Sequence, residues 1–371
     1  MPPKGPLHLQ KEVLQVEQCT GCGLCAGLCP YFNVVDERVA LTSTCGLSEG
    51  LCYEVCPRTP TDWELIDRTV FGAPRQDHVL GHWQGLYYAR AGEAAPAIEG
   101  KQYGGTVTAL VAFALTQGLA HGALLTSGLP GDFPVPVLAR TMDEVLAAAG
   151  SKYSATPTLQ ALVGAMRDGL GSMVVVGRPC QVLAVRKLQS VKRRTPVTNL
   201  TAGTKLFLLG LFCFWALSSA FYERFLPSKL NPLEVTRLDL PPYELVVSTP
   251  KGELRLPVDE LRPLIRPACE VCFDPTAEFA DLTVGSTEDD PRWNTLLARS
   301  ALGSELLEAA TAAGWLEVRP YPADRVHLLR EAVARKKRRV VTGPAGPPPY
   351  LFLQEAYHRG VVAAEEESGC S

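Results

Sequence analysis

Twelve cysteines in a chain of 371 residues dominate the chemistry that this sequence can carry. The N-terminal segment MPPKGPLHLQ has no apolar core of the kind found in secretory signals, so we expect a cytoplasmic protein in a reducing compartment. Thiols that cluster in such a compartment usually bind metal or take part in redox chemistry. Four of them lie close together in CTGCGLCAGLCP, residues 19–30.

The spacing of this run is C-x2-C-x2-C-x3-C-P, which is the ligand pattern of bacterial ferredoxins. Three thiolates spaced in this way can wrap around one face of a 4Fe–4S cubane, and the fourth serves a neighbouring cluster. Zinc is the alternative, but zinc sites usually combine separated C-x2-C pairs or include histidine. No histidine lies between Cys19 and Cys56, so the pattern favours an iron–sulfur centre.

A second run, CGLSEGLCYEVCP at residues 45–57, has one cysteine fewer. By the ferredoxin rule its last cysteine crosses back to complete the first cluster. The predicted ligands are Cys19, Cys22, Cys25 and Cys56 (the first set) and Cys29, Cys45 and Cys52 (the second set). The missing position falls on Ser48 or Thr42, whose hydroxyls are poor iron ligands at neutral pH. The second set can hold a 3Fe–4S cluster, a 4Fe–4S cluster with an oxygen or outside ligand, or none; we favour a cluster.

Four more cysteines lie far apart in the chain. Cys180 and Cys213 each follow a predicted strand, in VVVGRPC and LGLFC, whereas Cys269 and Cys272 form the loop motif CEVC. Two strand ends and such a loop can meet at one edge of a sheet, where four thiolates suit a 4Fe–4S cluster or zinc. The alternative is that Cys180 and Cys213 are buried small hydrophobic residues, and the chemistry alone leaves both interpretations open.

Beyond residue 85, short apolar runs alternate with helical stretches. The pattern predicts buried strands at 122–128, 172–177, 205–213 and 280–286, helices from Thr106 and over 181–191, and a hairpin over 243–258 that turns at PKG. We expect an α+β chain, with a ferredoxin-like domain and polar linker at 1–77 and a mixed α/β domain at 78–342. The tail, 343–371, begins with GPAGPPPYLF, which we expect to lack regular structure, and contains Cys370, a stray thiol.

Composition excludes several other classes of protein. A net charge of −3 gives no electrostatic reason to expect nucleic acid or an anionic membrane as a partner. The basic run RKKRR, 335–339, is better interpreted as a solvated helix end than as a binding site. The richest apolar run, 206–217, is too short to cross a bilayer and predicts a buried strand with its neighbour. No GxSxG, Walker A or strand-linked GxGxxG motif is present.

Four blocks of the chain resemble the β-subunit family of coenzyme F420-reducing hydrogenase, whose relatives include formate dehydrogenase β-subunits and chlorophyll-pathway reductases. The blocks are QYGGTVTALVAFAL from Gln102, VVVGRPCQVLAVRKL from Val174, LGLFC up to Cys213, and CEVCFDPTAEFADLTVGS from Cys269. The resemblance covers roughly residues 85–339, behind the ferredoxin-like unit.

The resemblance implies FAD beside an iron–sulfur cluster whose ligands are Cys180, Cys213, Cys269 and Cys272 (the inner set). It places the flavin near Gly104, Gly105, Thr106 and Thr108, with Gly285 and Ser286 as weaker candidates. The residues agree with this, because two glycines let a planar ring approach the backbone and a helix N-terminus favours an anion such as phosphate. A plain helix start with a threonine cap is the alternative.

Two departures from the family pattern bear on the ligand. Arg178 stands before Pro-Cys where a small residue or threonine is common, and it can face the flavin, a partner carboxylate or solvent. Glu288, Asp289 and Asp290 form an acidic lip where the family is often glycine-rich. Coenzyme F420 carries a phosphate and a polyglutamate tail, so this lip argues against coenzyme F420 as the substrate.

These features predict an oxidoreductase that relays electrons between a two-electron partner at FAD and one-electron iron–sulfur carriers, with two or three clusters. The expected partners are subunits of a hydrogenase, a formate dehydrogenase or a heterodisulfide-reductase-like complex, or ferredoxin. A stand-alone reductase of a small organic substrate and a non-catalytic adaptor that connects larger subunits are the alternatives. We expect no membrane span.

Overall fold

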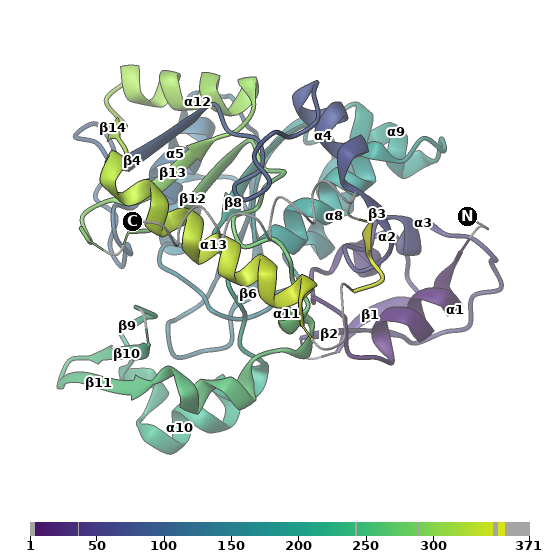
Figure 1. The fold of residues 1–371 in the computed structure, drawn as a ribbon, viewed down its shortest axis with the longest axis horizontal. Helices are drawn as coiled ribbons and strands as arrows, with labels where there is room; N and C mark the ends of the chain where they lie inside the picture. Colours follow the sequence, from purple (N-terminus) through teal and green to yellow (C-terminus); the bar gives the residue numbers. More distant parts are fainter. Residues whose placement is uncertain (1–3, 36, 242, 288, 344–347, 353–371) are drawn as a thin grey trace.

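A mixed eight-stranded β-sheet forms the centre of the protein (Figure 1). The computed structural model describes residues 4–35, 37–241, 243–287, 289–343 and 348–352. The strand order is β14 (Leu316–Pro320), β4 (Gly85–Ala91), β13 (Asn294–Ala298), β12 (Leu282–Ser286), β8 (Lys205–Leu211), β7 (Ser172–Gly177), β5 (Ala123–Ser127) and β6 (Val135–Ala139). The neighbours β5, β7, β8 and β12 are parallel, and the outer pairs are antiparallel. The expected mixed α/β architecture is therefore confirmed.

The central strands are apolar because both of their faces are buried. In β8, Leu206 and Leu208 pack into one hydrophobic cluster, whereas Phe207 and Leu209 pack into another on the opposite face. Side chains alternate along a strand, so a strand covered on both sides reads as a continuous apolar run. This confirms the four strands predicted from such runs, which correspond to β5, β7, β8 and β12.

Helices cover both faces of the sheet. The first face carries α5 (Thr106–Thr116), α6 (Met142–Ala147) and α12 (Ala301–Ala312), and the second carries α7 (Leu162–Arg167), α8 (Pro179–Ser190) and α9 (Pro196–Ala202). The two predicted helices, from Thr106 and over 181–191, correspond to α5 and α8. Because α8 begins two residues after β7 ends, its first turn lies at the carboxyl edge of the parallel strands.

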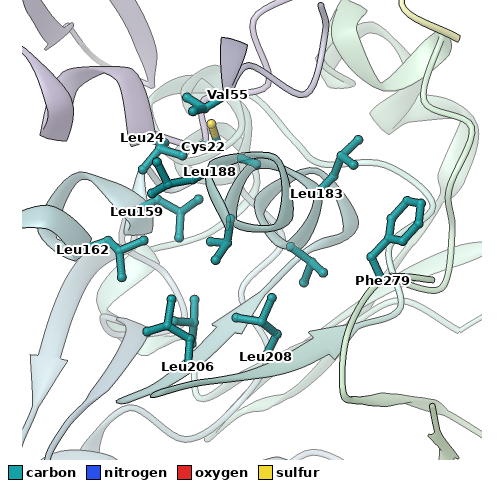
Figure 2. Packing of buried hydrophobic residues seen from close by; sticks show 14 of the residues in the cluster. Cys22, Leu24, Val55, Leu159, Leu162, Leu183, Leu188, Leu206, Leu208 and Phe279 are labelled. Atoms are coloured by element: carbon teal, nitrogen blue, oxygen red, sulfur yellow. The ribbon is translucent and has the colours of Figure 1, made fainter. Parts of the chain in front are cut away.

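The N-terminal cysteine-rich unit packs directly on the second face. Its elements are α1 (Pro6–Leu9), the π-helix Gln10–Leu14, α2 (Leu24–Leu28), β1 (Phe32–Val35), β2 (Arg38–Leu41) and α3 (Leu51–Glu54). Figure 2 shows Cys22, Leu24 and Val55 of this unit in one cluster with Leu183 and Leu188 of α8 and Leu208 of β8. The first set of cysteines is therefore fixed against the sheet by a shared core.

The segment expected to be a polar linker contains ordered elements. These are β3 (Thr61–Asp62) and α4 (Trp63–Phe71), which Asp62 caps by accepting a hydrogen bond from the Leu65 amide. One expectation for the tail was wrong: β15 (Leu351–Phe352) pairs in parallel with β3, although GPAGPPPYLF was expected to lack regular structure. A two-residue strand is held by a few backbone hydrogen bonds, which do not depend on side-chain type, so the amino-acid composition could not predict it. Cys370 lies outside the described residues.

The basic run RKKRR lies inside α13 (Val326–Val341), and its interpretation as a solvated helix end was wrong. Lys336 and Lys337 are buried, and Lys337 forms a 2.5 Å ion pair with the buried carboxylate of Glu278. Lys336 donates a 2.7 Å hydrogen bond to the Cys213 carbonyl. Helical periodicity turns part of the run toward the core, where distant residues supply its partners.

A smaller lobe carries the predicted hairpin. It contains β9 (Arg237–Asp239), β10 (Glu244–Thr249), β11 (Gly252–Pro257) and α10 (Leu226–Lys229), at the lower left of Figure 1. The hairpin turns between Thr249 and Gly252, as the PKG sequence predicted. Within the described ranges, no helix is both long and apolar enough to cross a membrane.

Candidate functional site

The first set of cysteines converges on a small cavity. Cys19, Cys22, Cys25 and Cys56 all line it, and apolar side chains complete its wall: Leu9, Val13, Leu14, Leu24, Val39 and Val55. The loop that carries these cysteines bends at Gly21 and Gly23, whose φ values of 64° and 85° favour glycine. Chain folding therefore brings Cys56 back to the other three, as the ferredoxin spacing predicted.

Burial and mutual repulsion dominate the titration of these thiols. Burial, followed by the neighbouring Cys56 thiolate, raises the pKa of Cys22 to about 12. Burial also raises the pKa of Cys56 to about 11, and burial and then Cys22 raise that of Cys25. Thiolates gathered in an apolar cavity need a positive core to offset their charge, which an iron–sulfur cluster or another metal centre supplies.

The cysteines of the second set also lie near one another, but they number three where a 4Fe–4S cluster uses four ligands. Burial raises the pKa of Cys52 to about 12, with further contributions from the charges of Cys29 and Cys45. Of the two candidates for the missing position, Thr42 is occupied elsewhere: its hydroxyl accepts a 2.5 Å hydrogen bond from Asn33 and donates to the Tyr31 carbonyl. Thr42 and Ser48 are both exposed, but the Thr42 hydroxyl is engaged, so Ser48 is the better candidate for the missing ligand position.

The inner set gathers at the carboxyl edge of the parallel strands. Gly177 of β7 pairs with Gly210 of β8, so Cys180 and Cys213, three residues beyond each glycine, leave the sheet side by side. The Cys213 amide donates a 2.8 Å hydrogen bond to the Pro275 carbonyl, which draws the CEVC loop to this edge. Cys269 accepts a 3.3 Å hydrogen bond from the Ala216 amide. The sequence alone could not decide between ligands and buried hydrophobic residues, and the topology favours ligands.

Cations act on several thiols of the inner set, whereas in the first set Lys187 and Arg58 act on Cys56. Burial raises the pKa of Cys213 to about 12, although Lys336 and Arg178 oppose this shift. At Cys272 the balance is reversed: burial acts to raise the pKa, but Lys336 and Arg58 outweigh it and lower the pKa. Burial and then Cys272 raise the pKa of Cys269.

The donor atoms of all three sets are thiol sulfurs, which are the ligands that iron–sulfur clusters use. In the described part of the chain, no group of three or more His, Cys, Asp or Glu side chains is placed to hold one metal ion. Two buried N–H donors near the thiolates, Nε of Arg58 and Nε of Arg266, have no hydrogen-bond partner among the described residues. Cluster sulfides are acceptors that can satisfy such donors.

The flavin candidates Gly104, Gly105 and Thr106 lie buried at the start of α5. A Cβ on Gly104 would come within 2.7 Å of the Ala89 carbonyl oxygen, so this glycine is required for packing against β4. Gly105 has a φ of 73°, and the Thr106 hydroxyl donates to the Ala89 carbonyl. Thr108 is partly exposed.

A residue that sequence reasoning missed links these candidates to Gly285. The Asn294 side chain accepts a 3.3 Å hydrogen bond from the Thr106 amide and donates one of 3.1 Å to the Gly285 carbonyl. Nothing in TEDDPRWNTLL marks this asparagine as different from a surface residue. A Cβ on Gly285 would overlap the Phe212 ring, and Ser286 is exposed. The buried Oε1 of Gln102, just before these glycines, has no hydrogen-bond partner in the described ranges.

The larger described cavity, about 720 Å³, lies elsewhere. It is an open groove between α3, α4 and α8, lined by residues such as Glu54, Thr61 and Lys187. Neither described cavity is lined by the flavin candidates. The structure brings Gly104, Thr106 and Gly285 together around Asn294.

Arg178 lies among cysteines. Its main chain caps α8 by donating to Gln181, and the Gln181 side chain donates to the Thr156 carbonyl. Burial acts to lower the pKa of Arg178, but the thiolates of Cys180, Cys213 and Cys269 outweigh it and raise the pKa. The cation is thus placed to offset the charge of the inner set.

The acidic lip is largely neutralised. Asp290 pairs with Arg292 at 2.8 Å and with Arg319 at 3.6 Å, and the Arg292 hydrogen bond lowers the pKa of Asp290 to about 2. Asp289 accepts a hydrogen bond from Tyr88 and lies 3.9 Å from Arg325. Glu288 lies outside the described residues. The charge argument against an anionic substrate is therefore weaker than the sequence indicated.

An α/β protein with cysteines at a sheet edge and a cysteine-rich N-terminal unit has the features of a redox protein, and comparison with known proteins agrees. The chain belongs to the coenzyme F420 hydrogenase/dehydrogenase β-subunit family. Residues 86–163 match the family's N-terminal model and residues 170–324 match its C-terminal model. All of the flavin candidates and all of the inner set lie within these ranges, whereas the first and second sets lie outside them.

Relatives and a solved structure support the same assignment. The chain is 32% identical to coenzyme F420 hydrogenase subunit beta of Methanothermobacter thermautotrophicus over 246 residues. This aligned region covers 64% of this chain and 86% of that protein. It is 30% identical to coenzyme F420-dependent sulfite reductase of Methanocaldococcus jannaschii. That alignment covers 80% of this chain but only 47% of the sulfite reductase. A chain of the F420-reducing [NiFe] hydrogenase complex from Methanosarcina barkeri matches with a TM-score of 0.64 and 27% identity, over 74% of this chain and 98% of that one. These relatives are redox enzymes or their subunits.

Proposed function

We propose that the protein is an electron-relay subunit of a larger redox complex, with a flavin and iron–sulfur clusters in one chain. When bound, a flavin supplies exchange between hydride and single electrons, and iron–sulfur clusters carry electrons singly. The first set would hold a 4Fe–4S cluster in a ferredoxin-like unit, and the inner set another in the family domain. The second set would hold a third cluster of reduced ligand number.

The observation that carries this proposal is the convergence of separate cysteines into adjoining sets. The charge of Cys180, an inner residue, contributes to the raised pKa of Cys22 in the first set, after burial and the effect of Cys56. The loop at residues 154–160 lies between the sets: the Leu159 amide donates to the Cys22 carbonyl, and Thr156 accepts from Gln181. A buried pair of adjoining centres serves electron transfer better than it serves structure alone.

For the flavin, the chain offers a helix N-terminus and two buried groups. The first turn of α5 leaves backbone N–H groups without helical partners, which favours a phosphate. Asn294 would keep this turn close to the end of β12, and Gln102 Oε1 would accept a hydrogen bond from a ring N–H. Arg178 would stabilise negative charge between the flavin region and the inner set.

Reduced coenzyme F420 is the first two-electron donor to test, because the relatives include a coenzyme F420 hydrogenase subunit and a coenzyme F420-dependent sulfite reductase. Arg292, Arg319 and Arg325 offset the acidic lip that argued against it. NADH and NADPH are the alternatives. The one-electron partner would be ferredoxin or a hydrogenase, formate dehydrogenase or heterodisulfide-reductase-like subunit.

The test is anaerobic reduction of the purified full chain by reduced coenzyme F420, NADH and NADPH in turn, followed by the flavin absorbance. Bleaching by one donor, followed by electron paramagnetic resonance (EPR) signals of reduced clusters, supports the relay. A protein that contains iron but releases no flavin on denaturation would be an adaptor. Turnover of a small organic substrate without any partner subunit would instead indicate a stand-alone reductase.

A further inference from the structure

Buried cations join the first set to the inner set. Arg58 follows Cys56, Arg266 precedes Cys269, and Lys187 lies on the helix that begins beside Cys180. Each reaches from its own segment to the other side: Arg58 to the Ala268 carbonyl at 2.8 Å, Arg266 to the Cys19 carbonyl at 2.9 Å, and Lys187 to the Cys56 carbonyl at 2.7 Å. Buried basic side chains thus cross the boundary between the two sets.

Arg58 links the segments of both sets. It lies two residues after Cys56, and its guanidinium donates to the Ala268 carbonyl, one residue before Cys269. The residue is only 8% exposed, and its guanidinium lies 4.6 Å from the centre of the Tyr350 ring. Its Nε is the unpartnered buried donor noted above.

The charge of Arg58 has no carboxylate to offset it, unlike that of Arg266. Arg266 forms a 3.1 Å ion pair with Glu37, and both side chains are buried. No Asp or Glu in the described ranges forms an ion pair with Arg58, although the residue is buried. A buried cation without a carboxylate partner stabilises whichever state of its surroundings carries more negative charge.

We propose that Arg58 is the positioning residue that couples the two centres, by holding the segments of Cys56 and Cys269 together and by stabilising the extra electron on either cluster. This inference rests on the proposed function, because it requires a cluster at each set. Reduction adds one negative charge to a cluster, so a neighbouring cation raises its reduction potential. Because Arg58 adjoins both sets, its charge acts on both potentials.

The test is an anaerobic EPR redox titration of the full chain with Arg58→Gln, which removes the charge and keeps an amide donor for Ala268. Both reduction potentials are expected to become more negative. The reduction equilibrium constant should fall about tenfold at each cluster, which corresponds to about 59 mV. Arg58→Lys keeps the charge and should restore most of the shift. The control is Arg68→Gln, which removes an exposed cation paired with Glu64 and should leave both potentials near those of the wild type.

A shift at only one cluster, or none in a variant with full iron content, would overturn the coupling. If Arg58→Gln does not fold with iron, the wild type still decides: fully reduced protein should show EPR signals broadened by interaction between neighbouring clusters. Two sharp, independent signals would contradict the inference. Wild-type protein without iron at one of the sets would refute the proposed function itself, which is a different result from unchanged potentials.

Discussion

The first and inner sets of cysteines are assembled in opposite ways. The first set comes mostly from one continuous loop and lies in a cavity walled by leucines and valines. The inner set comes from two strand ends and a distant loop, and Lys336, Arg178 and Arg58 act on it electrostatically. An apolar wall and a cationic wall affect a negatively charged cluster differently, because burial without cations disfavours added charge. Because Lys187 and Arg58 also act on Cys56, the two sets differ more in how the chain assembles them than in whether cations reach them.

The largest expected effect is the loss of one centre by removal of one ligand. Cys25→Ser should abolish the first cluster, and Cys213→Ser the inner one, while each variant keeps the other's EPR signal. Iron and sulfide quantitation under anaerobic conditions measures this loss. Cys370→Ser is the control, and it should leave the iron content unchanged. If Cys25→Ser and Cys213→Ser removed the same signal, the two sets would be one site.

A smaller effect is expected at the second set, where one ligand is missing. Ser48→Cys should add one iron and convert a 3Fe–4S spectrum to a 4Fe–4S spectrum. Thr42→Cys is the matched control, because the Thr42 hydroxyl already bonds to Asn33 and Tyr31 at the end of the β1–β2 pair. If neither variant changes the iron content or spectrum, the explanation of the missing ligand is wrong.

The cationic side of the comparison also depends on buried ion pairs. Lys337→Met removes one of the two cations that pair with the buried Glu278, and Arg75 remains. Leaving a buried charge without any partner costs about 3–5 kcal/mol, so we expect a smaller loss of unfolding free energy, at or below about 3 kcal/mol. Arg335→Met, two residues earlier on the same helix, removes only an exposed pair with Glu331 and should cost about 0.5 kcal/mol or less. Denaturant unfolding of both variants measures the difference. Equal costs would mean that the charges around Glu278 contribute little to stability.

The smallest effect concerns a lysine far from the cysteines, which is held by carbonyls alone. Lys152 donates to the carbonyls of Ala148, Ala149 and Gly150, and burial lowers its pKa from 10.5 to about 8. Between these values the unfolded chain binds the proton more tightly than the folded chain, so stability rises with pH.

Lys152→Met removes this linkage. The wild-type stability relative to the variant should therefore increase from about pH 8 to 10.5, by at most about 3 kcal/mol. Below about pH 8 the difference should be constant. Denaturant unfolding across this range measures it, and a difference that falls with rising pH would contradict the assignment.

Local patterns predicted the elements well, and partners from distant segments explain what they missed. The four central strands follow from apolar runs, because both faces of the sheet are covered. Lys337 was misjudged because its partner, Glu278, lies far away in the sequence. Asn294 was missed for the same reason, since its importance comes from Thr106 and Gly285, which only the folded sheet brings to it.

The candidate site divides in the same way. C-x2-C-x2-C spacing fixes the first set locally, so its grouping was predictable from sequence, including the return of Cys56. The grouping of the inner set depended on the parallel register of β7 and β8, which the sequence does not specify. The roles of Arg58 and Arg266 could not be predicted, because a lone arginine next to a proline has no distinguishing pattern.

Quantitation of iron, acid-labile sulfide, zinc and flavin on one anaerobic sample of the full chain tests the central claim most directly. We expect iron and sulfide in nearly equal amounts, sufficient for at least two clusters, together with one flavin per chain; a 3Fe–4S cluster at the second set would leave iron slightly below sulfide. Zinc in place of iron, or iron without sulfide, would contradict it.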